Sequence, residues 1–468
     1  MPALAQPANR PSPVELLPVF EELLPVQVLR DLIQATKQRF YERLFTPLIL
    51  VWCMLYQRLN ADHSQDAVVS YVATGAVDRL DQRHAEPVSH RLRSESTSAY
   101  NQGRKRLPLT VLQGAVAHTA HTVRQALGAD GLWLGHPVAL LDGTTFLLWP
   151  EPELVAHYGQ HQNQHGATFW VIMQTVVAFC LFSGALLGVV DGALYTSEQA
   201  LAVRLLAQAV AGSVYVGDRN FGVFSVAQAA RHYGVDVLLR LTRRRAHALA
   251  KRKLHTGEDL AVTWRPTPAD QLQPAMSAAP IAGRLIYVQV TPPGFRPVDL
   301  YLFTTLLEAS RYTVTQLVEL YGLRWHVELD IRYVKDTLEM SLLTSKSLDS
   351  VQKDLTAGLL AYNLIRGYMA KAAQGAGLSP LSLSFARCWR RIRDFWRTWQ
   401  TPESAAQRKR RCQRLLDSLA HCKLPPRKRF RLEPRAVRRR PAVYPALKGS
   451  RTEARQSLRE QLLEPSKS

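Results

Sequence analysis

The sequence predicts an α/β fold: a core with a mixed sheet, preceded by a helical region, interrupted by a strand-rich insertion and followed by a basic region. Apolar residues recur at helical spacing up to about residue 125, and from Leu132 onwards they form short runs separated by turns. Between 138 and 241 these runs form a hairpin and then alternate with helices, an order typical of a mixed sheet. With 468 residues, of which 47% are hydrophobic and 21% charged, the chain is long enough for two or three folded domains.

The N-terminal region is predicted to be mainly helical from residue 14 to about 125. Apolar positions repeat at helical spacing from Val14 to Ile33 and from Leu48 to Leu59, and several prolines interrupt the pattern. The segment 94–109 also carries a basic patch, for which a solvated helix face is an equally good explanation. The patch consists of Arg104, Lys105 and Arg106.

The segment from Phe169 to Val190 is a long, mainly apolar stretch. Its 22 residues carry no formal charge, so it is also long enough to span a bilayer. We interpret it as two buried strands, because β-branched residues dominate it and Ser183-Gly184 falls where a hairpin turn would divide it. A membrane span is the alternative.

Two further predicted strands end in an aspartate. The apolar run Val138–Leu141 ends at Asp142-Gly143, and Ser213–Gly217 ends at Asp218. The other elements of this part of the core are a helix over 197–210, a helix over 224–233 and a strand over 235–241. Glu198, near the start of the first of these helices, suits the positive helix end.

Residues 242–299 interrupt this alternation. The segment contains a run of three arginines, regularly spaced prolines and a strand-like run over 285–290, so we expect an inserted β-rich subdomain. The core then resumes with a strand over 300–305, a helix from about Thr313 and a helix over 351–373. The predicted domains are 1–128, 129–241, 242–299, 300–375 and 376–468.

Positive charge is concentrated in the last of these regions. The formal net charge is +21, and the residues from Arg387 onwards include 24 Lys or Arg against 7 Asp or Glu. Such a segment attracts a polyanion, either nucleic acid or an anionic membrane, and a solubilising tail is the remaining alternative. No clear period follows Pro425, so part of the tail is expected to order only on binding.

The cysteines and the N-terminus indicate a reducing cytoplasm. Five cysteines are scattered without paired spacing, so neither a disulfide framework nor a structural zinc site is predicted. The first 13 residues are polar and rich in proline, unlike a signal peptide.

The two strand-end aspartates are candidate metal ligands. Carboxylates that converge at one edge of an α/β sheet suit Mg²⁺, and a pair of such ions can hold the attacking and leaving oxygens of a phosphoryl transfer in line. For Asp142 or Asp218 alone, capping a turn is the simpler explanation. A third carboxylate would favour the metal site.

That third carboxylate lies in the stretch from Tyr321 to Lys335. On a continuous helix of about 100° per residue, Arg324, Glu328 and Lys335 share with Tyr321 an arc roughly 60° wide. Asp330 points to the opposite side. The face would present one metal ligand beside two cations and a phenol, which suits a phosphate backbone. A salt-bridged, solvated helix face is the alternative.

These motifs resemble the DDE transposases of bacterial insertion sequences, in the IS-four family. The resemblance rests on Asp142-Gly143-Thr144-Thr145, on Gly217-Asp218-Arg219-Asn220-Phe221, and on the family's Tyr-Arg-Glu-Lys signature, formed by Tyr321, Arg324, Glu328 and Lys335. It extends to 100–108, 302–305, 361–366 and 434–439, and so covers nearly the whole chain. Asn220 is a departure, because relatives often have glycine there.

The resemblance implies an RNase H-like core, interrupted by the insertion before the glutamate helix. It implies that Asp142, Asp218 and Glu328 are catalytic and bind two Mg²⁺, for which Mn²⁺ is expected to substitute. It further implies cut-and-paste movement of the chain's own insertion sequence through hairpinned ends. The enzyme would be a homodimer that binds double-stranded DNA at terminal inverted repeats and target sites, in the cytoplasm and associated with the nucleoid.

The same resemblance assigns DNA contacts to the N-terminal region, the insertion and the glutamate helix. Trp264 is a candidate for stacking on a flipped base, although packing in the core is the more common fate of tryptophan. The residues assigned to DNA are Tyr321, Arg324, Lys335, Trp325, Arg104, Lys105, Arg106 and Trp264.

Three other functions fit parts of the pattern. A domesticated DNA-binding protein without activity would not need all three carboxylates and the whole signature. An RNase H-fold nuclease would cut DNA without joining it. A basic protein of the membrane surface would account for the charge alone.

Overall fold

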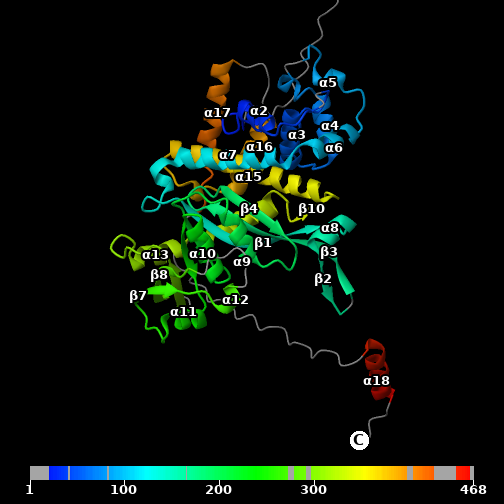
Figure 1. The fold of residues 1–468 in the computed structure, drawn as a ribbon. Helices are drawn as coiled ribbons and strands as arrows, with labels where there is room; N and C mark the ends of the chain where they lie inside the picture. Colours follow the sequence, from blue (N-terminus) through cyan, green and yellow to red (C-terminus); the bar gives the residue numbers. More distant parts are fainter. Residues whose placement is uncertain are drawn as a thin grey trace, which may run out of the picture. The chain divides into compact units, whose positions relative to one another are not determined.

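The computed structural model describes residues 20–40, 43–81, 84–164, 166–271, 279–290, 297–397, 404–425 and 450–463. The described residues up to Val290 and from Val298 to Pro425 form one compact unit (Figure 1). Helix α18 (Arg451–Leu463) belongs to a second unit and is described by itself. Its helical conformation was not expected from the absence of a clear period in the tail. The start of the helix predicted from Val14 and the tail motif 434–439 lie outside the described residues.

Helices dominate the described part of the N-terminal region, as predicted. The side chains from Leu48 to Leu55 in α3 are all buried, and Thr46 caps this helix by accepting a hydrogen bond from the Ile49 amide. Figure 1 shows α7 beside the 28-residue helix α15 (Leu348–Gly375), with which it packs closely. The N-terminal helices are α2 (Val26–Ala35), α3 (Pro47–Leu59), α4 (Gln65–Ala73), α5 (Val88–Arg91), α6 (Ser98–Arg106) and α7 (Leu109–Leu127).

In the described residues, ten strands form one mixed sheet in the order β2-β3-β1-β5-β6-β9-β8-β7, with β10 beside β1 and β4 beside β3. Strand β3 is antiparallel to β1 and β4, whereas β5 is parallel to β1 and β6 to β5. The order β4-β3-β1-β5-β6 within this sheet is the RNase H-like arrangement, so the predicted fold class is confirmed. The strands are β1 (Val138–Leu148), β2 (Gln160–Asn163), β3 (Gly166–Cys180), β4 (Leu186–Gly192), β5 (Val214–Gly217), β6 (Asp236–Arg240), β7 (Glu258–Trp264), β8 (Ile281–Val290), β9 (Val298–Thr304) and β10 (Leu342–Leu343).

The apolar segment 169–190 forms two strands rather than one span. Strands β3 and β4 pair with each other, and Gly184 adopts a φ of +69° in the turn between them. The hairpin prediction is therefore confirmed. Among the described residues, no helix combines the length and the apolar character that crossing a membrane requires.

The inserted segment extends the core sheet. Strand β9 is antiparallel to both β6 and β8, and β8 is antiparallel to β7. The segment is strand-rich, as expected, and it also contains helices α11 (Arg243–Ala250) and α12 (Pro268–Gln271).

Strand β1 is longer than predicted. We expected it to end at Asp142-Gly143, but it continues to Leu148 because Thr144 to Leu148 pair with β3 and the last two residues also pair with β10. Asp142 therefore lies within the strand, opposite Val177. Gly143 is a strand residue and not the turn that its residue type suggested.

Different helices cover the two faces of the sheet. On β1, Leu140 and Phe146 belong to the hydrophobic core that includes residues of α14 and α15, whereas Ala139 and Leu141 belong to a second core with α9 (Glu198–Leu206) and α10 (Phe224–His232). This alternation follows the two-residue period of a strand. The predicted helices at 197–210 and 224–233 are confirmed, with the first ending at Leu206.

The glutamate-bearing segment is not one continuous helix, so that assumption was wrong. Helix α13 (Val314–Gly322) is followed by a turn, by α14 (His326–Arg332) and by a π-helical turn (Tyr333–Thr337). Asp330 nevertheless points away from Glu328 into the core, where it forms a buried ion pair with Arg366 of α15.

Two helices complete the C-terminal side of the main unit. Helices α16 (Phe385–Arg397) and α17 (Ala405–Ala420) pack against each other and against α15. Helix α8 (Pro152–Tyr158) packs against β3.

Candidate active site

Asp142 and Asp218 lie at the same level on neighbouring parallel strands. Strand β1 pairs with β5 so that Val138 is opposite Val214 and Leu140 is opposite Val216. Continuing this register by two residues brings Asp142 opposite Asp218, directly after the last residue of β5. Both side chains then point to the face of Leu140 and Val216, which is the face that α14 and α15 cover.

Helix α14 brings Glu328 to this face of the sheet, and Arg324 connects it to Asp142. The helix packs on β1 and β3. Arg324 Nη2 donates to Glu328 Oε1 at 2.5 Å, and Arg324 Nη1 lies 3.5 Å from Asp142 Oδ2. The Glu328 side chain is 57% exposed and that of Arg324 only 17%, so the site opens to solvent at Glu328.

The neighbouring carboxylates affect Asp142. Its pKa is raised to about 6, mainly by burial and also by the carboxylates of Asp218 and Glu328. Arg324 and the Gly143 amide, which donates to Asp142 Oδ1 at 2.9 Å, oppose this rise. Among the neighbouring charged groups, Arg324 has the largest effect on the pKa of Asp142.

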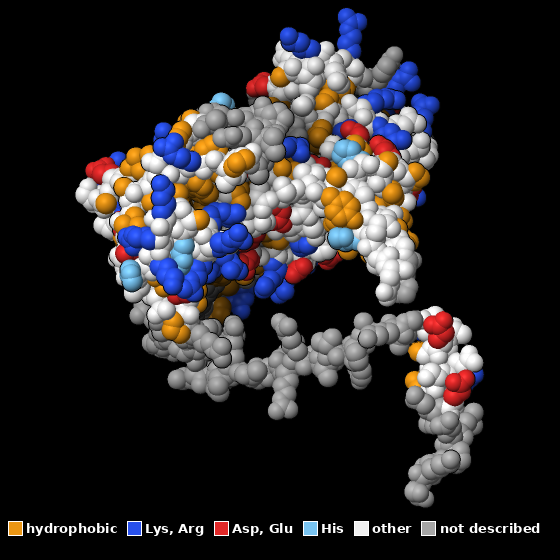
Figure 2. Space-filling view, turned by 60° about the horizontal axis from the view of Figure 1, so that its bottom comes forward, with side chains coloured by type: hydrophobic (Ala, Val, Ile, Leu, Met, Phe, Trp, Pro, Cys, Tyr) orange, Lys and Arg blue, Asp and Glu red, His pale blue; other side chains and the backbone are white. Residues whose placement is uncertain are grey.

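Tyr321 and Arg240 lie at the edge of the same site. Burial raises the pKa of the Tyr321 phenol, and Asp218 adds to this effect, whereas Arg324 and Arg240 oppose it. Arg240 ends β6 and also donates to the Asp299 carbonyl at 3.1 Å. Arg240 was not among the residues predicted from the sequence, although a cation that ends an apolar strand could have indicated it. Figure 2 shows Lys and Arg side chains around a small acidic group on one face of the main unit.

A second set of contacts supports the aspartates from the opposite face of the sheet. The Glu198 carboxylate packs against Gly143, where a Cβ would lie 2.2 Å from Glu198 Oε1. Gln174 Nε2 donates to the same oxygen at 2.8 Å, and Asn220 Nδ2 donates to Glu198 Oε2. The main-chain N–H of Asn220 in turn donates to Asp218 Oδ1 at 2.8 Å. The contacts among Glu198, Gln174 and Asn220 were not predicted, because these residues lie far apart in the sequence.

Lys335 and Trp325 lie on either side of Glu328 in the sequence, and their environments differ. Lys335 Nζ donates to the Thr145 carbonyl of β1 at 2.8 Å and lies 5.8 Å from the centre of the Phe146 ring. Burial lowers the pKa of Lys335. The Trp325 ring is half-buried and contacts the ring of His326, with 4.1 Å between their centres.

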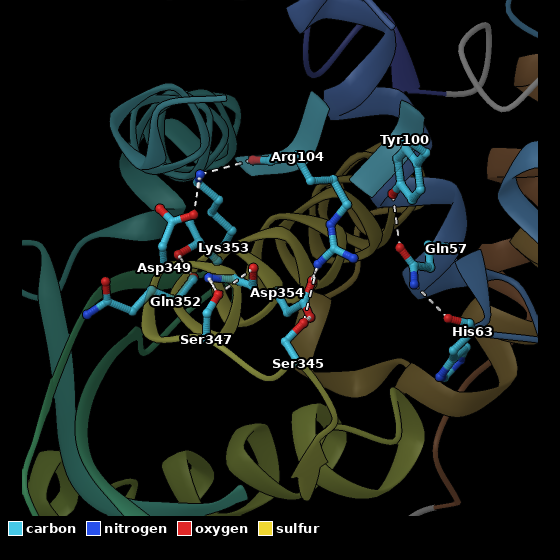
Figure 3. A network of polar contacts seen from close by, with 12 residues as sticks. Gln57, His63, Tyr100, Arg104, Ser345, Ser347, Asp349, Gln352, Lys353 and Asp354 are labelled. Atoms are coloured by element: carbon cyan, nitrogen blue, oxygen red, sulfur yellow. Dashed lines mark hydrogen bonds and ion pairs between the residues drawn. The ribbon is translucent and has the colours of Figure 1, made fainter. Parts of the chain in front are cut away.

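Within the basic patch 104–106, Arg104 is buried and the other two cations are exposed. Figure 3 shows the Arg104 guanidinium directed at Asp354 of α15, to which it donates a hydrogen bond. Lys353 Nζ donates to the Arg104 carbonyl at 3.0 Å. Arg104 thus connects α6 to α15, whereas Lys105 and Arg106 present their side chains to solvent.

Trp264 is a core residue in this structure. Its side chain is 7% exposed, and its ring packs edge-on against Phe303 and Phe224 with centre distances of 4.7 and 6.1 Å. The ring therefore packs in the core in this conformation, and it also lines a pocket of about 710 Å³ beside α11 and β7.

The residues present suit divalent metal ions. In the part of the chain that the structure describes, no three Asp, Glu, His or Cys side chains converge closely enough to bind one ion as they stand. A guanidinium lies between Asp142 and Glu328, so a cation already occupies the space that the carboxylates share. Carboxylate oxygens are the hard ligands that Mg²⁺ prefers, and Asp142 has two carboxylate neighbours in Asp218 and Glu328.

An RNase H-like sheet with carboxylates on neighbouring central strands defines a class of enzymes that act on phosphodiesters of nucleic acids. The family described as "Transposase DDE domain" matches residues 133–364, and together with the relative below this match supports a DDE transposase of the IS4 type. The chain is 27% identical over 357 residues to the transposase InsG for insertion sequence element IS4 of Escherichia coli (strain K12), with 74% of this chain and 78% of the relative covered. Among solved structures it is similar to the piggyBac transposase synaptic complex with hairpin DNA, at 9% identity and a TM-score of 0.40, covering 87% of this chain and 88% of that one. Transposases of this family generally use divalent metal ions.

Proposed function

We propose that the protein moves its own insertion sequence by a cut-and-paste route that passes through hairpinned DNA ends. The observation that carries this proposal is the register of β1 and β5, which sets Asp142 beside Asp218 on the face where Glu328 and Arg324 lie. The IS4-type relationship supports the substrate, double-stranded DNA with terminal inverted repeats.

We assign Asp142, Asp218 and Glu328 as the ligands of two Mg²⁺, with Mn²⁺ able to substitute. When bound, such a pair of ions neutralises phosphate charge and promotes attack by water and then by a 3′-hydroxyl. The chain's own contribution is placement of the ligands. Strand pairing fixes Asp142, the Asn220 amide holds Asp218, and Glu328 stands at the open side of the site.

The DNA backbone is expected to contact the residues around this site. Tyr321, Arg324 and Lys335 would bind phosphates of the cleaved strand beside Trp325, and Lys105 and Arg106 are exposed for contacts further away. Arg104 and Trp264 are buried, and we assign them to packing. Contacts to phosphates set register on the DNA rather than base sequence. Two ends would be joined in a synaptic complex of a homodimer, in the nucleoid.

The experiment is strand cleavage and strand transfer with DNA that carries the element's own terminal repeats, with and without Mg²⁺. Asp142→Ala and Glu328→Gln should each reduce cleavage at least about 100-fold, because removal of a preorganised electrostatic group costs that much or more in an active site. Glu319→Gln removes an exposed carboxylate of α13 and serves as the matched control, which should cleave normally.

The products separate the remaining alternatives. Hairpinned ends followed by joined DNA support the proposal, and cleaved but never joined DNA would make the protein a nuclease. Normal cleavage by Asp142→Ala would remove the metal assignment.

A further inference from the structure

Helices α16 and α17 enclose a groove remote in sequence from the catalytic carboxylates. The groove has a volume of about 760 Å³ and lies between Arg391, Asp394 and Phe395 of α16 and one face of α17. The residues of the α17 side are Arg411, Arg414, Leu415, Ser418 and His421. Pockets of this size accept ligands as large as a nucleotide unit.

The helical hairpin that forms the groove is anchored at its base. Ile392 and Leu419 are fully buried between the helices and α15. The Ser384 amide donates to the Cys422 carbonyl at 2.7 Å, and the Leu424 amide donates to the Ser382 carbonyl at 2.7 Å. The basic side chains therefore project from a packed support and not from a loose tail.

Contacts with neighbouring residues hold the polar side chains of the groove. Arg391 Nη1 donates to the Ser418 carbonyl and, at 3.1 Å, to the Ser418 hydroxyl. The Arg411 guanidinium lies 5.8 Å from the centre of the Phe395 ring. His421 Nδ1 donates to the Asp417 carbonyl at 2.7 Å. A guanidinium has five N–H donors, so the contacts of Arg391 leave donors on this arginine for a ligand.

This lining favours a phosphate-rich ligand. Three guanidinium groups face one carboxylate, and guanidinium forks match phosphate oxygens in pairs. A membrane surface is disfavoured, because none of the large apolar side chains described in α16 and α17 is exposed, as insertion into lipid would require.

The geometry points to a second DNA-binding site in the groove between α16 and α17, where Arg391, Arg411 and Arg414 bind backbone phosphates of duplex DNA. This inference rests on the proposed transposase function for its ligand and adds a site outside the catalytic centre. Since the contacts are to phosphates, binding at the groove is independent of base sequence and depends on salt.

The test is the salt dependence of binding to a duplex of random sequence, measured with the full-length protein in EDTA so that no cleavage occurs. Arg411→Ala/Arg414→Ala removes two groove cations. Lys409→Ala/Arg410→Ala removes two exposed cations of the same helix that do not line the groove. Each phosphate contact contributes about 0.9 to the slope of log K against log salt. The groove variant should therefore lose about 1.8 from that slope, and the control should keep the wild-type slope.

Asp394→Asn provides a test that poor folding cannot imitate. It removes the groove's one carboxylate, so DNA binding at low salt should become several-fold tighter. Equal losses in the two double variants, no loss in the groove variant, or no gain in Asp394→Asn would each overturn the site. A groove variant with normal DNA binding that no longer binds phosphatidylserine vesicles would assign the groove to lipid. Binding in EDTA needs no active carboxylates, so these results stand apart from the cleavage test.

Discussion

Replacing Gly143 by alanine should weaken both the fold and the active site through Glu198. The new Cβ would lie 2.2 Å from Glu198 Oε1 and 2.3 Å from its Cδ, so the carboxylate must move away. Its side chain is flexible, and the main cost is therefore the loss of the hydrogen bonds from Gln174 and Asn220. Buried bonds to a charged group contribute about 1.5–3 kcal/mol each, and because Glu198 is only half-buried we expect about 1–3 kcal/mol for both. Alanine is better than glycine within a strand by roughly 0.5–1 kcal/mol, which leaves a net loss of up to about 2.5 kcal/mol.

The Gly143→Ala variant should also lose cleavage activity. Glu198 holds the Asn220 side chain, and the Asn220 main-chain amide donates to Asp218 Oδ1, so loss of the Glu198 contact should let the turn that carries this amide shift, although Gln199 still contacts Asn220. A misplacement of about 1 Å at a reacting centre can cost about 100-fold in rate. We expect single-turnover cleavage at saturating DNA to fall by roughly 10–100-fold, with DNA affinity unchanged. Urea unfolding gives the stability, and cleavage kinetics give the rate.

Two controls isolate the contact. Gly188→Ala also adds a Cβ to the sheet, but its nearest neighbour is Leu205 at 3.6 Å, so this variant should be as stable as the parent or more so. In a Glu198→Ala background the carboxylate is gone, and Gly143→Ala should cost nothing further. If the two changes instead add within about 0.5 kcal/mol, Gly143 does not act through Glu198 and the reasoning is refuted.

Three further variants test other parts of the structure. Arg324→Gln should bind Mn²⁺ several-fold more tightly in the absence of DNA, because no guanidinium then competes for the carboxylates, while cleavage falls; calorimetric titration that finds unchanged affinity would show that Arg324 does not compete. Arg366→Leu leaves Asp330 buried without its partner, so unfolding in urea should require about 3–5 kcal/mol less; a change under about 1 kcal/mol would contradict the buried pair. Trp264→Ala should lower stability by about 3–5 kcal/mol as a core truncation, and a variant with normal thermal unfolding but no hairpinned DNA would assign the ring to the substrate instead.

Local sequence patterns were sufficient for the elements whose boundaries depend on local chemistry. The hairpin β3–β4 was predictable because β-branched residues fill both strands and Gly184 supplies the positive φ of the turn. Strand β5 was predictable because its apolar run ends at a polar residue. The parallel register of β1 and β5 then brings Asp142 beside Asp218, as their positions after two apolar runs suggested, and their role as metal ligands stays a prediction.

Elements decided by tertiary contacts were not predictable in the same way. The length of β1 depends on pairing with β3 and β10, and Gly143 suggested a turn only because its neighbour Glu198 was unknown. The break between α13 and α14 and the π turn at 333–337 also leave no clear mark in the apolar pattern. Single π turns occur often at functional sites, and this one coincides with the contact of Lys335 to β1.

The basic patch 104–106 shows why residue type alone does not identify a DNA contact. Arg104 and Lys105 are adjacent and carry the same charge, yet only the Arg104 side chain is buried, where it pairs with Asp354 of α15. Removing one partner of a buried pair leaves an uncompensated charge that destabilises the protein, whereas removing an exposed cation alters mainly the surface potential. Mutation of Arg104 would thus weaken DNA binding through misfolding as readily as through a lost contact, so a loss of binding assigns a DNA contact only at exposed positions such as Lys105 and Arg106.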